Sequence, residues 1–355
     1  MLNNLQALRA LAAYLIVFAH LHVIGLPGAE YLFPGVDLFF VISGFVMVHT
    51  TAGRRQSPAY FMAKRVARIV PLYWSLTLLV SACAIIMPEA MTFTRPDLAQ
   101  LVKSLAFVAY DKHDGLMRPL LAPGWTLNYE MFFYVIFAAT LPIKCDRVRV
   151  GAACGVLMLL VTCGLIARPS GDLARFYTSP VLGEFALGML LGLSHKRISQ
   201  HPLAVSSAIM IGAVSITLML TPGISSEGPL RLLAPGLPAA AVVYAALNLD
   251  ARGVRCDQPW VLRMGGASYS LYLTHLFVVT PASFVLHRIA PLSHPFVYLW
   301  AASILAVATA VAILCYIFFE VPIAARLRRL RDSSAAIRLG FRRIVTRQND
   351  LAVRG

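Results

Sequence analysis

Apolar runs of about 18 residues or more recur along the whole chain, and they constrain the fold more than any other feature. The 355 residues are 59% hydrophobic and 13% charged, with a mean hydropathy of +0.72. That charged fraction is about half of the roughly 25% found in soluble domains. The alternating segments of a membrane β-barrel are absent. The sequence therefore predicts an all-α fold, a polytopic integral membrane helical bundle.

The apolar runs predict about ten transmembrane helices. The predicted spans are residues 7–25, 35–52, 69–88, 126–142, 149–167, 178–194, 203–221, 231–248, 265–286 and 296–320. Most of the 31 Lys and Arg lie on the side that these spans give to the N-terminus, so both termini are predicted to be cytoplasmic. The net charge of +15 then serves orientation and contact with membrane lipids, and no nucleic-acid partner is expected.

Residues 1–324 are predicted to form the transmembrane domain, and residues 325–355 a basic cytoplasmic tail. The tail carries nine arginines, and an interfacial helix is the favoured interpretation. The six cysteines include no CxxC pair, which argues against both disulfides and zinc. His113 beside Asp114, in the long loop between the third and fourth spans, is a weak metal signal. No metal site and no permanently bound cofactor are predicted.

Arg9 and His20 lie eleven residues apart in the first predicted span. On a helix this spacing leaves the two side chains about 20° apart around the axis and roughly 16 Å apart along it. A histidine near the middle of a bilayer is costly, so an ionisable residue at that depth is by default a functional-site hypothesis. The chain is therefore expected to carry out its chemistry inside the membrane.

Asp37 falls near the outer end of the second span, in the segment GVDLFFVISGF. Two interpretations stay open. The carboxylate could hydrogen-bond to His20, orienting the imidazole and raising its basicity. Alternatively, it is a favourable acid in the first turn of a helix. Ser43 lies deeper in the same span, and Glu184 in the sixth span is a weaker candidate acid.

Arg65 and Arg68 are spaced i,i+3 in RRQSPAYFMAKRVARIVPLYW, so they project from the same side of a helix at the inner surface. Paired guanidinium groups suit phosphate oxygens, which they can bind with two parallel hydrogen bonds. The alternative is ordinary loop charge, since Arg54, Arg55 and Lys64 accompany them.

The segment PGWTLNYEMFFY places Glu130 near the start of the fourth span, with Tyr134 one turn later on the same side. A glutamate at that depth is a candidate to bind or deprotonate a hydroxyl group. Trp125 and Tyr129 are either interfacial belt residues or a stacking surface for a sugar ring.

Near the end of the chain, Ser268, Tyr272 and His275 stand at i, i+4 and i+7 and form one stripe on a helix. The stripe faces either a cavity or a neighbouring helix, to which it would hydrogen-bond. A Ser–His nucleophile pair is disfavoured because no acid completes it. Glu320, among arginines, is expected to be an ion-pair partner.

Taken in order, these segments resemble the acyltransferase 3 family of bacterial integral-membrane O-acyltransferases, in particular its short, exopolysaccharide-modifying members. The resemblance spans nearly the whole chain. Its pieces are R-x10-H from Arg9 to His20, GVDLFFVISGF at 35–45, R-x-x-R at 65–68, GWTLNYEMFFY at 124–134 and SYSLYLTH at 268–275.

The resemblance implies an O-acyltransferase of the bacterial inner membrane that moves an acyl group, usually acetyl, from cytoplasmic acyl-coenzyme A to a carbohydrate hydroxyl. The acceptor would be exopolysaccharide, O-antigen or a lipid-linked oligosaccharide, and an oligomer is compatible with it. The family pattern makes His20 the essential histidine with Arg9 as its companion, Arg65 and Arg68 the donor-binding pair, and Glu130 an important acid.

The expected mechanism is direct transfer, with His20 as general base oriented by Asp37 or Glu130, and with Arg9 or a hydroxyl group stabilising the oxyanion. A covalent route, in which His20 itself is acylated, stays open. Two other functions also stay open: a lipid-linked sugar flippase or transporter, and a non-catalytic subunit of a polysaccharide exporter.

Overall fold

The computed structural model describes residues 2–87, 89, 97–111, 117–221, 228, 230–289, 296–326 and 329. Within these ranges the chain is helical, apart from connecting segments and an isolated bridge between Asp111 and Met117. The α-helices are α1 (Asn3–His20), α2 (Gly35–Thr51), α3 (Pro58–Ile86), α4 (Leu98–Leu105), α5 (Gly124–Thr140), α6 (Asp146–Ala167), α7 (Asp172–Tyr177), α8 (Val181–Gln200), α9 (Val205–Met219), α10 (Leu237–Ala251), α11 (Pro259–Thr274), α12 (Leu276–Ile289) and α13 (Phe296–Cys315). Short helical segments are η1 (Leu21–Ile24), η2 (Ala29–Tyr31), η3 (Leu232–Gly236) and η4 (Tyr316–Glu320).

The prediction of an all-helical membrane protein is confirmed for the described residues, but the count of about ten spans is not. Among the described residues, seven helical segments are long and apolar enough to cross a membrane, and α11 with α12, bent by 53° at their junction, would make an eighth. The span predicted at residues 203–221 is shorter in the structure, where α9 has 15 residues, whereas α5 has the 17 residues predicted for its span and begins two residues earlier. At 1.5 Å per residue, α9 extends about 22 Å, less than the hydrocarbon thickness of about 30 Å.

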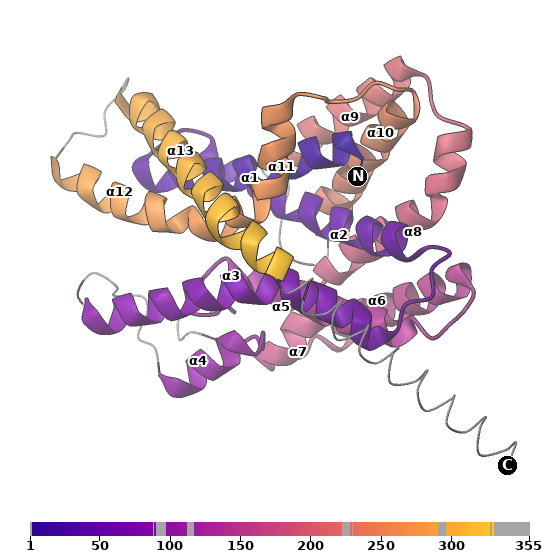
Figure 1. Cartoon of the computed structure of the whole chain (residues 1–355), viewed down its shortest axis with the longest axis horizontal. Helices are drawn as coiled ribbons and strands as arrows, with labels where there is room; N and C mark the ends of the chain where they lie inside the picture. Colours follow the sequence, from indigo (N-terminus) through magenta and orange to yellow (C-terminus); the bar gives the residue numbers. More distant parts are fainter. Residues whose placement is uncertain are drawn as a thin grey trace, which may run out of the picture.

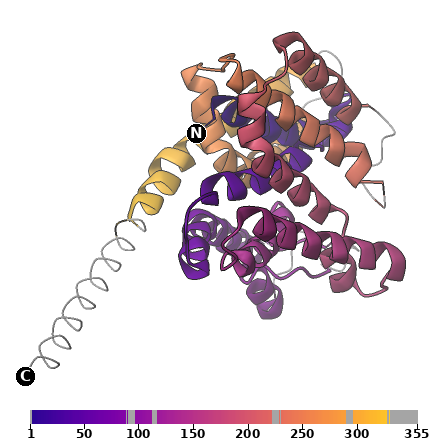
Figure 2. The ribbon, with the colours of Figure 1, turned by 90° about the vertical axis from the view of Figure 1, so that its right-hand side faces the viewer.

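The helices form two groups. Helices α3 to α7 lie together on one side, and α1, α2 and α8 to α13 lie on the other (Figure 1). The two groups stay distinct when the molecule is turned by 90° (Figure 2). Contacts between α6 and α8 and between α11 and α3 join them. The candidate site described below lies where the two groups meet.

Glycines allow the closest helix pairs to approach. A Cβ atom on Gly188 of α8 would lie 2.0 Å from the carbonyl oxygen of Val41 in α2. A Cβ on Gly265 of α11 would lie 2.3 Å from the carbonyl oxygen of Gln6 in α1. Small residues at helix interfaces bring the backbones together and gain dispersion contacts, which drive helix association in lipid. These contacts set α1 directly against α11 and α2 directly against α8.

Helix α3 begins eleven residues before the predicted span 69–88. Ser57 caps it by accepting a hydrogen bond of 3.2 Å from the backbone N–H of Tyr60, and Pro58 occupies its first position. Arg65 and Arg68 therefore lie within a continuous helix, which confirms that they share a helical face.

The start of α1 is tied to the loop between α10 and α11. The Asn4 side chain donates to the carbonyl oxygen of Val254 at 2.8 Å and accepts from the backbone N–H of Cys256 at 2.8 Å. The Asn3 amide also donates to Asp257 at 2.6 Å. These bonds fix the register of α1 against α11, on which the geometry of the site depends.

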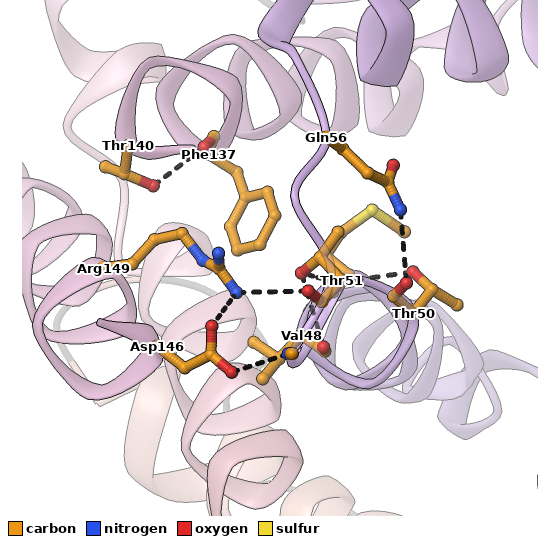
Figure 3. Close-up of polar contacts among 10 residues, drawn as sticks. Val48, Thr50, Thr51, Gln56, Phe137, Thr140, Asp146 and Arg149 are labelled. Carbon is orange, nitrogen blue, oxygen red and sulfur yellow. Dashed lines mark hydrogen bonds and ion pairs between the residues drawn. The ribbon is translucent and has the colours of Figure 1, made fainter. Parts of the chain in front are cut away.

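The end of α2 is tied to the start of α6 in a similar way (Figure 3). The buried Arg149 guanidinium donates to Asp146 at 2.6 Å and to the carbonyl oxygen of Thr51 at 3.5 Å. The second carboxylate oxygen of Asp146 accepts from the backbone N–H of Gly53 at 2.9 Å. The pair therefore satisfies backbone groups left open where α2 ends.

Candidate active site

A cavity of about 140 Å³ lies between the two helix groups, with walls from α1, α2, α3, α5 and α11. Most of its lining is apolar, but charged and hydroxyl groups from all five helices converge on it. Its lining residues are Arg9, Val36, Phe39, Phe40, Ile42, Ser43, Val46, Met47, Arg65, Arg68, Ile69, Thr126, Leu127, Glu130, Tyr134, Ser268, Tyr269 and Tyr272. An apolar cavity of roughly 150 Å³ accommodates a molecule the size of benzene, so this one has room for a small group.

Arg9 projects from α1 toward α11. Its guanidinium donates to the Ser268 hydroxyl at 2.9 Å and to the Gln6 side chain at 3.3 Å. The Ser268 hydroxyl in turn donates to the carbonyl oxygen of Gly265 at 2.8 Å. The orientation of the arginine is therefore set by its own helix and by the helix beside it.

Glu130 projects from α5 into a cluster of hydroxyl groups. Its carboxylate accepts a hydrogen bond of 3.0 Å from Ser43 of α2 and a short one from Tyr134, one turn further along α5. It also lies near enough to Arg9 to attract it electrostatically. These contacts place Glu130 at the end of the cavity where the arginines lie.

Arg65 and Arg68 enter the same end of the cavity from α3. The guanidinium of Arg65 lies over the rings of Phe61 and Tyr134, at 5.3 and 5.7 Å from their centroids. Its Nε is buried and has no hydrogen-bond partner among the described residues. Arg68 is near enough to Arg9 to repel it. Three cations thus converge near two carboxylates, those of Glu130 and Glu320, and the Nε of Arg65 stays open to an anion.

Tyrosine hydroxyls of α11 connect the cavity walls, and the sequence analysis missed one of them. Tyr269 donates to the carbonyl oxygen of Ile69 in α3 at 2.7 Å. Tyr272 donates to the carbonyl oxygen of Pro123 at 2.8 Å and lies 2.8 Å from the hydroxyl of Thr126. Tyr269 follows Ser268 directly, so it does not share the helical face of the predicted stripe. Its place in the motif SYSLYLTH was the signal that could have identified it.

His20 is the last residue of α1 and lies, half-buried, outside the cavity lining. Its Nδ1 lies 2.8 Å from the carbonyl oxygen of Ile16. Its ring lies edge-on to those of Phe33 and His275, at centroid distances of 5.3 and 4.7 Å. The stripe predicted on α11 therefore faces the stripe predicted on α1, with Ser268 opposite Arg9 and His275 opposite His20.

Of the two interpretations of Asp37, the pairing with His20 is wrong. Asp37 is in the first turn of α2, as the second interpretation held, and it forms an ion pair of 2.7 Å with Arg231. The same guanidinium binds Glu184 of α8 at 3.1 Å. Both carboxylates are fully buried. A guanidinium between two acids satisfies them better than a neutral imidazole can, because it brings a permanent charge and several donors. A lone arginine at the start of a predicted span was a signal that the sequence analysis did not use.

Trp125 lies next to the cavity and not in its lining. Its ring packs edge-on against Phe40 and Tyr129, at centroid distances of 6.3 and 6.0 Å. Tyr129 stacks on Phe176 at 3.8 Å.

Glu320 accepts a hydrogen bond of 2.8 Å from Ser270, while Arg9 and Arg68 attract it electrostatically. His113, Asp114 and most of the basic tail lie outside the described residues.

Apolar helices around a buried cavity that collects arginines, a glutamate and hydroxyl groups define a multi-pass membrane protein with an internal polar site. The chain belongs to the acyltransferase 3 family, because the sequence model of that family, described as "Acyltransferase domain", matches residues 2–317. It is accordingly an enzyme of the acyl-transferring class.

Several curated proteins are similar to this chain. "Exopolysaccharide production protein ExoZ" of Rhizobium meliloti is 37% identical over 69% of this chain and 76% of its own length. "Putative membrane-bound transacylase BcsY" of Komagataeibacter xylinus is 27% identical over 80% of this chain and 74% of its own length. "Peptidoglycan O-acetyltransferase OatA" of Listeria monocytogenes is 26% identical over 90% of this chain and 55% of its own length. No solved structure matches the chain.

Proposed function

We propose that the chain is a membrane O-acyltransferase that moves an acyl group, with acetyl as the first choice, from cytoplasmic acyl-coenzyme A to a hydroxyl of a cell-surface or lipid-linked carbohydrate. The observation that carries this proposal is the convergence of Arg9, Arg65 and Arg68 on one cavity, at the opposite end of α1 from His20. The printed names of the relatives refer to exopolysaccharide and to peptidoglycan O-acetylation, which supports a carbohydrate acceptor.

The arginine end of the cavity is our candidate for the donor site. Coenzyme A carries several phosphate charges, and guanidinium groups bind phosphate oxygens with paired, charge-assisted hydrogen bonds. The buried, unpartnered Nε of Arg65 is a donor available to such an anion. The bias of Lys and Arg toward the side of the N-terminus supports placing this end at the cytoplasmic face, where the donor is found.

The pantetheine arm connects this end to His20. It is about as long as five extended residues, roughly 15–20 Å. Arg9 and His20 lie eleven residues apart on one helix, or roughly 16 Å along its axis. The nucleotide can therefore stay among the arginines while the thioester reaches the imidazole. The same distance keeps Arg9 away from an oxyanion formed beside His20, so we assign Arg9 to the donor and leave the oxyanion to a hydroxyl group.

His20 is our candidate general base. The carbonyl oxygen of Ile16 can only accept a hydrogen bond, so Nδ1 carries the proton and the neutral ring presents Nε2 as the basic atom. This backbone carbonyl, and neither Asp37 nor Glu130, orients the ring. In the proposed step Nε2 takes the hydroxyl proton as the oxygen attacks the thioester carbonyl. The carbon–sulfur bond then breaks, and the thiolate takes up the proton and leaves as coenzyme A.

Purified protein in lipid vesicles, supplied with labelled acetyl-coenzyme A and glycan, tests this proposal. Free thiol and acylated glycan should appear together, and H20Q should abolish both. Movement of sugar without thiol release would point to a flippase instead. Labelled protein trapped in the absence of acceptor would point to the covalent route. Mass spectrometry of the surface polysaccharide of a deletion strain would identify the acyl group and the acceptor.

The donor assignment has its own test, in which R65A/R68A is compared with R54A/R55A. The control removes the same charge from exposed positions that do not line the cavity. A hydrogen bond to a charged group contributes about 1.5–3 kcal/mol, so loss of one such bond should raise the donor KM roughly 10- to 100-fold. The kcat should change much less. Equal donor KM values for the two double variants would contradict the assignment.

A further inference from the structure

A second histidine lies beside the proposed base. His275 occupies the junction at which α11 ends and α12 begins, and its side chain is fully buried. Its ring is inclined by 62° to that of His20, with 4.7 Å between the ring centroids. Among the described residues, His275 is the nearest histidine ring to His20, and His20 is the nearest to His275.

The hydrogen bonds of the two rings fix the same tautomer in both. Nδ1 of His275 lies 2.7 Å from the carbonyl oxygen of Tyr272, as Nδ1 of His20 lies 2.8 Å from that of Ile16. Since a carbonyl oxygen only accepts, both Nδ1 atoms carry protons and both Nε2 atoms have free lone pairs. Nε2 of His275 is buried and has no partner among the described residues. Burying an acceptor without a donor is unfavourable, so such an atom calls for an explanation.

We propose that His275 is a positioning residue for the reaction, the second member of a histidine pair that shares the proton that His20 takes from the acceptor hydroxyl. This inference rests on the proposed function. Two neutral rings in this tautomer cannot bond to each other, because neither Nε2 is a donor. Protonation of His20 at Nε2 creates that donor, and Nε2 of His275 is then an acceptor already in place.

The histidine pair does not change which bonds form and break in the reaction. The hydroxyl oxygen forms its bond to the acyl carbon, and its proton moves to Nε2 of His20. The carbon–sulfur bond breaks with its electron pair on sulfur. The shared proton then returns through His20 to the thiolate. His275 therefore stabilises the charged state that exists between the two proton transfers.

The groups that act on the pair within the described residues lie on neighbouring elements. His22 of η1 and Arg118, before α5, are near enough to act on His20 electrostatically. The hydroxyl of Tyr272, on the element of His275 itself, is bonded to Pro123. None of these groups is altered by a substitution at His275, so a change in pH dependence reports on the pair.

The test compares H275Q and H275A with H287Q. His287 of α12 has the same kind of bond, from Nδ1 to the carbonyl oxygen of Ser283 at 2.8 Å, but its side chain is exposed. We expect H275Q and H275A to lower kcat about 10-fold or more with the donor KM unchanged, and H287Q to have no effect. Because the protonated form of His20 loses its acceptor in H275A, the acid limb of the kcat profile of that variant should move to lower pH.

Two outcomes would refute the proposal that His20 and His275 share the proton. One is an acid limb that stays in place in H275A, since a loss of kcat alone also follows from a purely structural role. The other is wild-type kcat in H275Q, because glutamine offers an acceptor oxygen but takes no proton. Should the variants fail to fold, 15N-histidine NMR of the wild-type protein decides. The Nε2 signals of His20 and His275 should shift together with pH, and a His275 signal that stays constant while His20 titrates would refute the inference. A failure of the proposed function appears separately, as absence of thiol release from the wild-type protein.

Discussion

Replacing Arg231 by methionine should destabilise the protein strongly, because it leaves two buried carboxylates without a counter-charge. The Asp37 and Glu184 side chains are 2% and 0% exposed, and that of Arg231 is 12% exposed. Removing one partner of a buried ion pair costs about 3–5 kcal/mol, since the remaining charge is left unpaired. For a large chain each kcal/mol lowers Tm by about 2 °C, so R231M should lower Tm by roughly 6–10 °C.

The exposed pair Arg175–Asp172 supplies the matched control. Its side chains are 62% and 41% exposed, and surface pairs contribute about 0–1 kcal/mol. Thermal unfolding in detergent, followed by intrinsic fluorescence, would compare R175M with R231M. The triple variant D37N/E184Q/R231M removes all three charges and should regain much of the lost Tm, because buried ion pairs are often replaceable by neutral groups. Equal Tm values for R231M and R175M would refute the reasoning.

Two further predictions concern helix packing and the orientation of Arg9. G188A should lower the free energy of unfolding by about 1–3 kcal/mol, because its Cβ would lie 2.0 Å from the Val41 carbonyl oxygen. The control G151A, whose Cβ would have nothing within 4 Å, should be neutral or slightly stabilising. Thermal unfolding of both variants measures the difference. S268A removes the hydroxyl that orients Arg9 and should raise the donor KM roughly 10-fold for a loss of about 1.5 kcal/mol. Unchanged Tm in G188A, or unchanged donor KM in S268A, would contradict these contact assignments.

The membrane class and the helical positions of most spans could be predicted because burial in lipid demands long apolar runs, which are visible locally. The paired stripes were also predictable. Arg9 and His20 share a face by helical periodicity alone, and so do Ser268 and His275. The number of spans was harder to predict, because α9 and the bent α11–α12 pair have the composition of spans without the length or straightness.

Pairing between distant residues was not predictable. One interpretation gave Asp37 the partner His20, because a carboxylate beside a long apolar run needs a partner and His20 lies in the adjacent span. The structure pairs it with Arg231, 194 residues away, because η3 brings that guanidinium between α2 and α8. Glu130 likewise finds its partner Ser43 on another helix, 87 positions away in sequence. A residue's helical face says which way it points, but not which helix lies opposite.

By itself, the sequence determined that this protein folds in a lipid bilayer, which helices it forms and on which helical face each polar side chain lies. The first two follow from the cost of exposing backbone groups to lipid, and the third follows from local periodicity. Only the tertiary structure decided which of those faces meet. Arg9 reaches Ser268 across 259 positions and His20 reaches His275 because closely packed glycines and the bonds of Asn4 fix α1 against α11. Such contacts carry no periodic signal along the chain, and so the site exists only once the helices have packed.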